Sequence, residues 1–412
     1  MQTVFDAIIV GAGPAGSSAA ILLARAGWHV ALIEKQTFPR RKVCGECIAA
    51  SNLPLLDSLG IGKAFAAGAG PELRHVALMH GNSITVADLP PALHGRHRWG
   101  RALGRETLDT LLLEQARHSG AHVLQPWSVQ AINGAPGHWR CGVRAQNSHT
   151  PLILQAPVFI AANGSWEPLP SERATRPTAH RPSDLLAFKA NFAGARLAHG
   201  LLPVLSFSGG YGGMVGAGAG VTTIACCVRR DRLEAVRRGQ PGLSAGAAVE
   251  LMLKHECLGV REALETATRE GPWLAAGPLH PGIRVGADDG FLRIGNAAGE
   301  AHPIIGEGMS MALQSAWLLC SQLLDANDPT TAPTAAWQRG VQRRYAAQWH
   351  RQFGRRLQLA AAFAHLAMRP ASAALLAASV RRWPRLLTLG AQWGGKTRSA
   401  VDSSITTTGE TA

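Results

Sequence analysis

The chain has 412 residues, of which 46% are hydrophobic, so it can bury a large core and is not globally disordered. This length exceeds one core of ordinary size, and we expect two interleaved lobes and a tail. Lys and Arg outnumber Asp and Glu by 41 to 27, which suits an acidic partner, a nucleic acid or an anionic membrane, although a basic host composition gives the same excess. No recognition motif accompanies the charge, so we expect no nucleic-acid binding.

The seven cysteines are an odd number at irregular spacings, and the first residues carry no secretory pattern, which predicts a reduced, cytoplasmic protein. No run of 18 apolar residues occurs, because Arg369 and Pro370 split the most hydrophobic stretch. We therefore expect no membrane span, and contact with a membrane only at its periphery.

The segment FDAIIVGAGPAGSSAAILLARAGWHVALIEK, residues 5–35, predicts a strand, a turn, a helix and a second strand. Residues 7–10 are a short β-branched run, residues 17–26 have helical periodicity, and residues 29–33 are again apolar. This order is typical of the first unit of a dinucleotide-binding fold.

The glycines of this turn have the spacing G-x-G-x-x-G. Gly11 allows the tight turn, Gly13 lets a pyrophosphate approach the backbone, and Gly16 lets the helix pack on the strand. Glu34 ends the second strand, where its carboxylate can accept hydrogen bonds from a ribose diol. No second unit of this kind follows, which favours FAD, with any nicotinamide cofactor visiting without a lobe of its own.

The motif CGEC, residues 44–47, invites a metal or redox interpretation. A lone C-x-x-C cannot close a zinc site, so we expect no metal. A redox-active pair and an ordinary loop remain open.

The middle of the chain is rich in strand patterns. Residues 122–160 predict short strands, residues 157–168 a strand that runs into a loop, and residues 181–235 the antiparallel sheet of a substrate lobe. Tyr211 lies among glycines in this sheet and either projects into a substrate cavity or packs in the core. Cys226 and Cys227 are adjacent and should point to opposite faces.

The stretch RIGNAAGEAHPIIGEGMSMALQSA, residues 293–316, places much small-residue backbone before an apolar helix expected from about Met309 to Leu324. The C-terminal 70 residues are also predicted to be helical, and between residues 329 and 401 there is no Asp or Glu. They form either a basic amphipathic face for an anionic membrane or an acidic partner such as a carrier protein, or a helical cap with a solvated basic rim. The last residues, SSITTTGETA, predict a disordered tail.

These segments resemble the single-Rossmann FAD enzymes, which include the aromatic hydroxylases related to p-hydroxybenzoate hydroxylase, the geranylgeranyl reductases and the flavin-dependent halogenases. The resemblance rests on GAGPAGSSAA, on FPRRKVCGECI (38–48), on RALGRETLDTLLLEQARHSGA (101–121) with Arg105 at a helix start, and on residues 293–316. It implies an α/β fold, with a doubly wound FAD-binding lobe, a smaller mixed-sheet substrate lobe and a helical C-terminus.

The resemblance also implies site residues. The cofactor-binding set is Gly11, Gly13, Pro14, Ala15, Gly16, Glu34, Lys35, Arg41, Cys44, Gly45, Arg105, Asn296, Pro303, Gly306, Gly308 and Met309. The N–H groups near Gly306 and Gly308 and the positive end of the following helix would face the flavin ring. Tyr211, Glu46 and His302 are the catalytic candidates, and Glu300 lies on the same segment as His302.

The chain departs from the family at several places. Asn296 and Asn163 stand where the families usually have Asp, and the second change bears on direct use of NADPH or NADH, because that segment assists the visiting nicotinamide. The segment GGYGGMV keeps only the Tyr of an aromatic-rich geranylgeranyl reductase segment, and the halogenase pattern W-x-W-x-I-P is absent from the chain.

We therefore expect a discontinuous FAD lobe of residues 1–75, 98–180 and 281–327, a substrate lobe of residues 76–97 and 181–280, and helices over residues 328–400 before the tail at 401–412. The resemblance implies an FAD-dependent monooxygenase that hydroxylates an electron-rich aromatic, polyketide-like or peptide-borne substrate of secondary metabolism through a flavin C4a-hydroperoxide. NADPH, NADH or an external flavin reductase would supply the electrons. The alternatives are a reductase of carbon–carbon double bonds in an isoprenoid-like substrate and a non-catalytic FAD-bound partner protein.

Overall fold

The computed structural model describes residues 2–93, 95–148, 150–170, 180–325 and 333–393. Its first layer is a five-stranded parallel sheet in the order β20-β12-β2-β3-β8. The strands are β2 (Ala7–Val10), β3 (Val30–Ile33), β8 (His122–Leu124), β12 (Val158–Ala161) and β20 (Leu292–Arg293). Three helices belong to the same core: α1 (Pro14–Arg25), α4 (Arg105–His118) and α8 (Gly308–Asp325). This is the doubly wound lobe that the sequence predicts.

Helix α1 begins earlier than its periodicity predicts. It starts at Pro14 rather than at residue 17, because proline has its φ preset for the first helical position and lacks the N–H that would be unpaired there. The other predicted helix of this lobe, Met309–Leu324, differs from α8 by one residue at each end.

Smaller elements flank the parallel sheet. A second sheet joins β1 (Gln2–Val4), β11 (Leu152–Ala156), β10 (His138–Ala145) and β9 (Trp127–Ala135) in that order. Two-stranded pairs form between β4 (Cys47–Ile48) and β7 (Arg101–Ala102), and between β19 (Gly282–Ile283) and β21 (Gly299–Glu300). The short helices are η1 (Ala50–Asn52), α2 (Leu53–Ser58), α3 (Gly62–Gly68), η3 (Gly295–Ala297) and η4 (Pro303–Ile305).

The substrate lobe is built on a mixed eight-stranded sheet. Its path is β17 (Thr268–Arg269), β13 (Leu185–Ala193), β16 (Val221–Arg229), β15 (Gly210–Gly216), β14 (Leu201–Phe207), β5 (His75–His80) and β6 (Ser83–Asp88), and β18 (Leu274–Ala276) also pairs with β13. Among these described strands, β14 and β5 alone pair in parallel. The two faces have separate cores, and the adjacent Cys226 and Cys227 belong to different ones, which confirms that they point to opposite sides.

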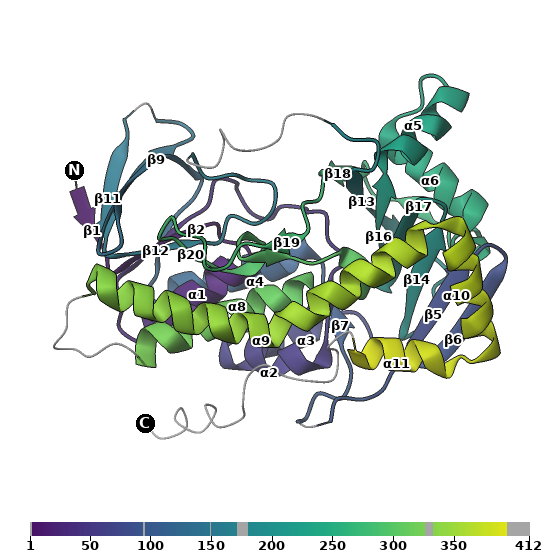
Figure 1. Cartoon of the computed structure of the whole chain (residues 1–412), viewed down its shortest axis with the longest axis horizontal. Coiled ribbons are helices and arrows are strands. Elements are labelled where there is room, and N and C mark those ends of the chain that lie inside the picture. The colour runs from purple at the N-terminus through teal and green to yellow at the C-terminus, as the bar shows by residue number, and fades with distance from the viewer. Residues whose placement is uncertain (1, 94, 149, 171–179, 326–332, 394–412) are drawn as a thin grey trace.

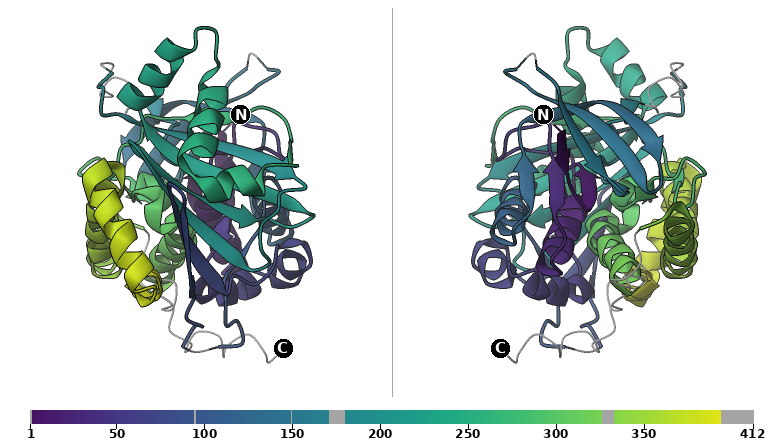
Figure 2. Two further views of the ribbon diagram at one scale, coloured as in Figure 1. Left: turned by 90° about the vertical axis from the view of Figure 1, so that its right-hand side faces the viewer. Right: turned by 90° about the vertical axis from the view of Figure 1, so that its left-hand side faces the viewer.

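Helices cover both faces of this sheet. On one face lie α5 (Arg230–Gly239), α6 (Ala245–Glu256) and α7 (Leu258–Ala263). The C-terminal helices α9 (Ala335–Met368), α10 (Pro370–Arg382) and α11 (Arg385–Trp393) contact strands of the same sheet through α9·β15, α10·β5 and α11·β6. Figure 2 shows these C-terminal helices gathered along one flank of the molecule.

Helix α9 joins the two lobes. It buries a stripe that includes Val341, Tyr345, Trp349 and Phe353, at the three- and four-residue spacing of one helix face. The Tyr345 hydroxyl donates to the carbonyl of Arg293, 2.8 Å away, at the end of the parallel sheet. In Figure 1, α9 runs across the molecule from the parallel sheet toward the eight-stranded sheet. The C-terminal region is therefore a structural cap, whatever else its outer face does.

No single helix within the described residues has the length and hydropathy needed to cross a bilayer. Helices α9 and α10 meet those limits only when taken together, and the chain bends by 104° between them.

Candidate functional site

One large cavity, of about 580 Å³, lies between the lobes. Its lining runs from the glycine-rich turn after β2, past the segments that follow β3, β12 and β20, to the eight-stranded sheet and helices α10 and α11. In a parallel sheet the carboxyl ends of the strands share one edge, which is where α/β proteins bind their ligands.

The glycines of the turn have three different structural roles. Gly11 has φ +102°, and a Cβ atom there would lie 2.5 Å from the carbonyl oxygen of Ala162. A Cβ on Gly16 would lie 1.9 Å from the carbonyl oxygen of Gly11, so the close packing of α1 requires a glycine. Gly13 is different, because its nearest neighbour across the groove would be an Arg105 nitrogen 3.8 Å away. Gly11 and Gly16 thus build the turn, and Gly13 keeps the groove open.

The groove beside this turn is cationic. Arg105 is buried and forms two hydrogen bonds of 2.7 Å with Asp109; burial opposes the arginine's charge, yet the carboxylate raises its pKa. Burial, together with Arg40 and Arg105, lowers the pKa of Lys42 to about 8. Helix α1 begins here with no side chain capping its first N–H groups. Asp109 and Glu34 offset part of this charge, since Arg40 lies 3.8 Å from the first and 3.5 Å from the second. The three cations and the uncapped helix N-terminus still leave the groove positive, which suits a diphosphate.

Glu34 is held at the end of β3, where a ribose would lie. Its Oε2 accepts from the backbone N–H of Ala12 at 3.0 Å, and its Oε1 accepts from that of Gln36 at 2.9 Å. A carboxylate offers about four lone-pair sites, and Oε2 also lies 3.5 Å from the Arg40 guanidinium, so Oε1 keeps more capacity for a ribose hydroxyl.

Two predicted contacts lie off the cavity lining. Lys35 pairs with Glu167 at 3.2 Å, and Arg41 pairs with Glu106 at 3.6 Å and donates to the carbonyl of Glu270. Arg40 and Lys42, the sequence neighbours of Arg41, line the cavity instead. The sequence reasoning missed this pair, since the run FPRRK does not reveal which cations turn inward.

The remaining predicted cofactor contacts fall into two groups. Those on the cavity lining are Gly11, Gly13, Pro14, Ala15, Glu34, Cys44, Gly45, Arg105, Asn296, Pro303, Gly306, Gly308 and Met309, while Gly16 packs behind the turn. Cys44 and Cys47 are both reduced, and the Cys44 sulfur accepts from the backbone N–H of Glu46 at 3.4 Å.

The two asparagines that replace the family aspartates both face the cavity. Asn296 donates to the Ser165 hydroxyl at 2.8 Å, and Asn163 donates to the carbonyl of Glu167 at 2.6 Å. The Oδ1 atom of Asn163 is buried without a hydrogen-bond partner among the described residues. A buried acceptor of this kind is costly unless a ligand donates to it, and the hydroxyl groups of FAD are suitable donors. Together with the cationic groove, it indicates that the residues present fit FAD.

Two glycines lie at the start of α8 and line the cavity. Gly306 adopts the left-handed conformation, with φ +65°, and Gly308 opens α8 with no atom within 4 Å of the place that a Cβ would take. Both line the cavity together with Met309. The positive end of α8 therefore lies at this part of the cavity, where it would stabilise negative charge on a bound ring.

Glu46 lines the cavity, and its carboxylate is already engaged by neighbouring groups. It is 1% exposed, with φ +58°, and it accepts from the backbone N–H of Arg105 at 2.9 Å and from the Thr223 hydroxyl at 2.6 Å. Its Oε1 also accepts from the buried ammonium of Lys189. All three interactions tie the CGEC loop to neighbouring elements, two of them to strands of the eight-stranded sheet. The sequence reasoning did not single out Lys189; the only signal was a lone cation within the apolar strand LLAFKANFA.

Tyr211 and His302 meet across the two lobes. The Tyr211 hydroxyl lies 3.3 Å from Nδ1 of His302, and both side chains are buried and line the cavity. Burial raises the pKa of Tyr211 well above the usual tyrosine value, and burial with His365 lowers the pKa of His302. Both groups are therefore neutral near pH 7. Glu300 is buried nearby, and burial raises its pKa.

The far part of the cavity is apolar. Its walls are strands β5 and β14, through Val76, Leu78, Leu202 and Val204, and helices α10 and α11, through Leu376, Val380, Leu387 and Leu389. The large apolar share of this lining matches a hydrophobic ligand.

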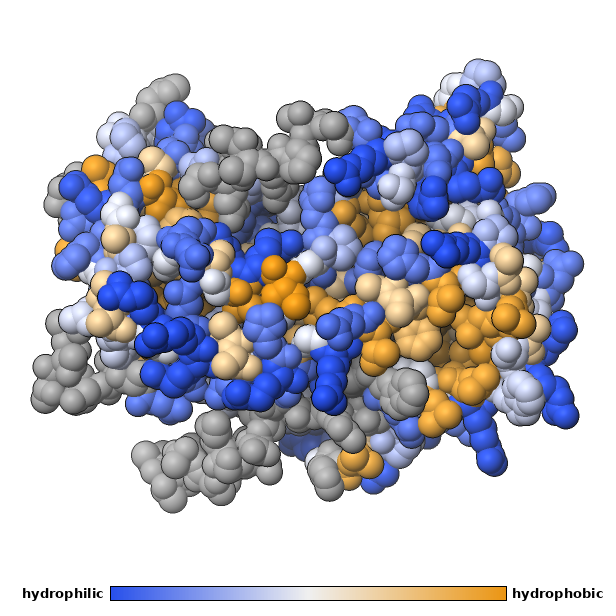
Figure 3. Space-filling model, in the orientation of Figure 1, coloured by the Kyte–Doolittle hydropathy of each residue, from blue (hydrophilic) through white to orange (hydrophobic). Residues whose placement is uncertain are grey.

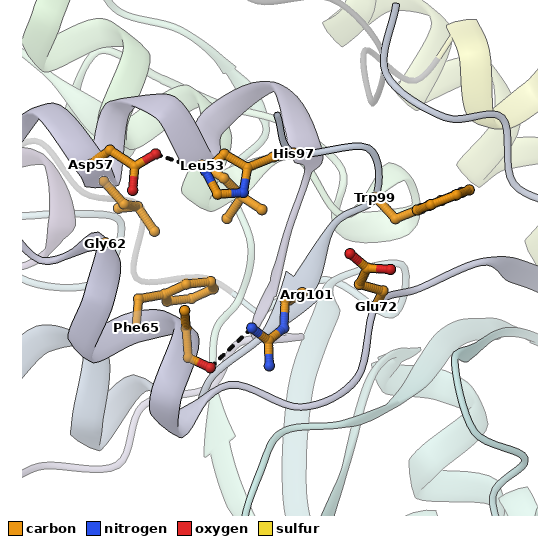
Figure 4. A pocket seen from close by; sticks show the side chains of 10 residues that line it. Leu53, Asp57, Gly62, Phe65, Glu72, His97, Trp99 and Arg101 are labelled. Carbon is orange, nitrogen blue, oxygen red and sulfur yellow. Dashed lines mark hydrogen bonds and ion pairs between the residues drawn. The ribbon is translucent and has the colours of Figure 1, made fainter. Parts of the chain in front are cut away.

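A second cavity, of about 80 Å³, lies beside α2 and α3 (Figure 4). Its polar side chains are already paired: Asp57 lies 2.7 Å from the His97 ring, and Arg101 donates to the carbonyl of Ala66 at 3.0 Å. This space is too small for a dinucleotide, and we assign it no role.

Comparison with known proteins supports the cofactor assignment. The family model described as "FAD binding domain" matches residues 4–333. Conditioned medium factor receptor 1 of Dictyostelium discoideum is 25% identical over 347 residues, and the match covers 79% of this chain but only 64% of that protein. Menaquinone reductase of Mycobacterium tuberculosis is 35% identical over 131 residues, which are 31% of this chain and 30% of that protein. Menaquinone reductase of Mycolicibacterium smegmatis is 26% identical over 356 residues, which are 84% of this chain and 82% of that protein.

The fold is shared with solved flavoenzymes. The myxobacterial chondrochloren halogenase CndH has a TM-score of 0.74 at 19% identity, covering 98% of this chain and 95% of its own. PqsL of P. aeruginosa, in complex with 2-aminobenzoylacetate, has a TM-score of 0.67 at 16% identity, covering 96% and 99%. At such identities the likeness concerns the fold alone.

Proposed function

Since the chain belongs to the FAD-binding-domain family, we propose that it is an FAD-dependent oxidoreductase, and more specifically a monooxygenase that hydroxylates a lipophilic, electron-rich aromatic substrate. The observation that carries the proposal is the continuity of the cavity, from the cationic groove past Tyr211 and His302 into the apolar compartment. Reduced FAD, when bound, supplies the activation of dioxygen that this chemistry needs. The chain's own part is to position the substrate, exclude water and move a proton.

Tyr211 and His302 supply the proton path in this proposal. An electron-rich ring becomes more reactive when its hydroxyl loses a proton. Such a proton can pass to the Tyr211 oxygen while the Tyr211 proton passes to Nδ1 of His302, 3.3 Å away. His302 is suited to accept it because burial lowers its pKa and keeps the ring neutral near pH 7.

The apolar compartment supplies orientation and dryness. Leu78, Val204, Leu376 and Val380 bring no hydrogen-bonding group into it, so it selects a substrate with a hydrophobic body. Excluding water strengthens the polar interactions near the reacting ring and limits loss of activated oxygen to solvent.

Anaerobic reduction of the purified, FAD-loaded protein by NADPH or by NADH, followed by mixing with oxygen, tests the proposal. A monooxygenase should reoxidise in two phases, with a transient spectrum that is neither reduced nor oxidised flavin. Reduction by dithionite alone, followed by the same two phases, would mean that an external reductase supplies the electrons. Reoxidation in one phase, with or without an added phenolic probe, contradicts oxygen transfer.

A second candidate is a reductase of carbon–carbon double bonds in an isoprenoid-like substrate. The apolar compartment favours it equally, and the mycobacterial menaquinone reductase is a relative along most of its own length. In this case the proton moves in the opposite direction, from the Tyr211–His302 pair to the substrate carbon. Saturation of a side-chain double bond in a short-chain menaquinone by the reduced protein without oxygen, detected by mass spectrometry once the quinone ring has been reoxidised, would favour the reductase over the monooxygenase.

A further inference from the structure

The outer side of the C-terminal helices is unusually hydrophobic. Of the twelve large hydrophobic side chains that are exposed in the described chain, half lie between residues 359 and 389. They are Leu359, Leu366, Leu375, Trp383, Leu386 and Leu389, with Leu375 70% and Trp383 59% exposed. Figure 3 shows hydrophobic surface gathered over this part of the molecule, at the lower right. We call this surface, with its arginines, the C-terminal face.

The charged side chains that the C-terminal helices contribute to the C-terminal face are arginines. Arg369, Arg381, Arg382 and Arg385 are all exposed on it. No Asp or Glu occurs anywhere between residues 329 and 401, so no carboxylate of this segment neutralises them. Exposed leucine and tryptophan mixed with arginine is the composition of a helix that lies in a membrane interface.

The same helices form a wall of the cavity. Leu376 and Val380 of α10 and Leu387 of α11 line it from inside. Leu386 and Leu389 both line the cavity and are exposed, at 40% and 45%. The apolar surface is therefore continuous from the outer side of α11 into the interior, and the cavity opens at the C-terminal face.

We propose that the C-terminal face docks on an anionic lipid bilayer and places the opening of the substrate cavity at the membrane surface. A hydrophobic substrate dissolved in the bilayer would then reach the cavity without crossing water, a step that rests on the proposed function. The docking itself does not depend on which reaction the flavin performs.

A bilayer accounts for more of this surface than an acidic protein does. An acidic chain would neutralise the arginines but would leave Leu375 and Trp383 without an apolar partner. An anionic bilayer offers headgroups to the arginines and hydrocarbon to these two side chains at the same depth. The bend of 104° between α9 and α10 also lets the helices lie on a membrane rather than cross it.

Co-sedimentation of the full, FAD-loaded chain with vesicles tests the docking without any turnover. One set of vesicles contains phosphatidylcholine alone, and the other contains equal parts of phosphatidylcholine and phosphatidylglycerol. The charge variant is R381E/R382E, and its matched control is R237E/R238E, an exposed adjacent pair near the end of α5. The apolar variant is L375S/W383S, whose residues lie off the cavity lining, and its control is Val4→Ser, 66% exposed on β1.

The wild-type chain should bind the anionic vesicles and bind phosphatidylcholine weakly. Each arginine near such a surface contributes enough that R381E/R382E should lower the partition coefficient by about tenfold or more. Loss of the two apolar side chains in L375S/W383S should lower it by a similar factor. Neither control should change it by more than about twofold.

Three results would overturn the proposal. Equal losses in R381E/R382E and R237E/R238E would mean that only the overall charge attracts the chain. Unchanged binding in L375S/W383S, with strong binding to polyglutamate, would favour an acidic protein partner. No binding of the wild type to either vesicle would exclude docking, while the flavin experiments would still decide the proposed reaction.

Discussion

The buried pair between Glu46 and Lys189 gives a sharp stability prediction. Both side chains are 1% exposed, and the carboxylate also accepts from Thr223 and from the backbone of Arg105. In Lys189→Met the carboxylate loses the ammonium that donates to it and stays buried. Removing one partner of such a pair costs about 3–5 kcal/mol.

Adding Glu46→Gln to Lys189→Met should restore most of this loss. The amide oxygen still accepts a hydrogen bond, and no uncompensated charge remains in the interior. The double variant should therefore be more stable than Lys189→Met alone, although two residues are changed. Lys254→Met is the matched control, because its pair with Glu250 is partly exposed, and its loss should cost about 0.2–1 kcal/mol.

Urea unfolding followed by tryptophan fluorescence measures these differences. A cost below about 1 kcal/mol in Lys189→Met, or a double variant less stable than it, would refute this account of the pair.

Further predictions concern the groove and the proton path. Gly13→Ala should lower the free energy of unfolding by less than about 1 kcal/mol but weaken FAD binding by about tenfold, since its methyl group would enter the groove. Gly16→Ala should lower the free energy of unfolding by about 3 kcal/mol or more, because its Cβ would lie 1.9 Å from a carbonyl oxygen. Equal stability of the two variants in urea would contradict this distinction. Asp109→Asn should weaken FAD binding by about tenfold, because Arg105 loses the carboxylate that anchors it. Flavin fluorescence titration measures this affinity, and an unchanged value would mean that Arg105 does not contribute to FAD binding. Because burial lowers the pKa of His302, turnover should fall with decreasing pH only below the usual histidine pKa of 6.5. His302→Gln should abolish this loss at acid pH and slow turnover by about 10²–10⁴-fold. If the variant keeps the same acid side of the pH profile, another group is responsible for it.

Much of the FAD lobe was predictable because its signals are local. The turn at Gly11, Gly13 and Gly16 needs glycine for reasons of backbone conformation and close contact, and such needs are written directly in the sequence. The alternation of apolar and polar residues in 181–235 likewise predicts an antiparallel sheet, and the four long strands of this segment, β13, β16, β15 and β14, pair in that way.

Side-chain direction over irregular segments was not predictable. In FPRRK, the prediction selected Arg41, yet Arg40 and Lys42 face the cavity and Arg41 pairs with Glu106. Glu46 has the chemistry of a proton donor, but its partner Lys189 is 143 residues away, so only the fold reveals that the carboxylate is engaged. Long-range pairing of this kind depends on how two lobes pack and leaves no periodic trace.

Local residue spacing and composition were enough to specify the dinucleotide-binding unit, the preference for FAD and the one-sided charge of the C-terminal region. The meeting of Tyr211 and His302 depends on packing between the lobes, and so does the double role of α10 and α11, which wall the cavity while they expose Leu375 and Trp383. A helix pattern shows which residues share a face, whereas contact with distant strands selects the face that is buried and the face that meets solvent.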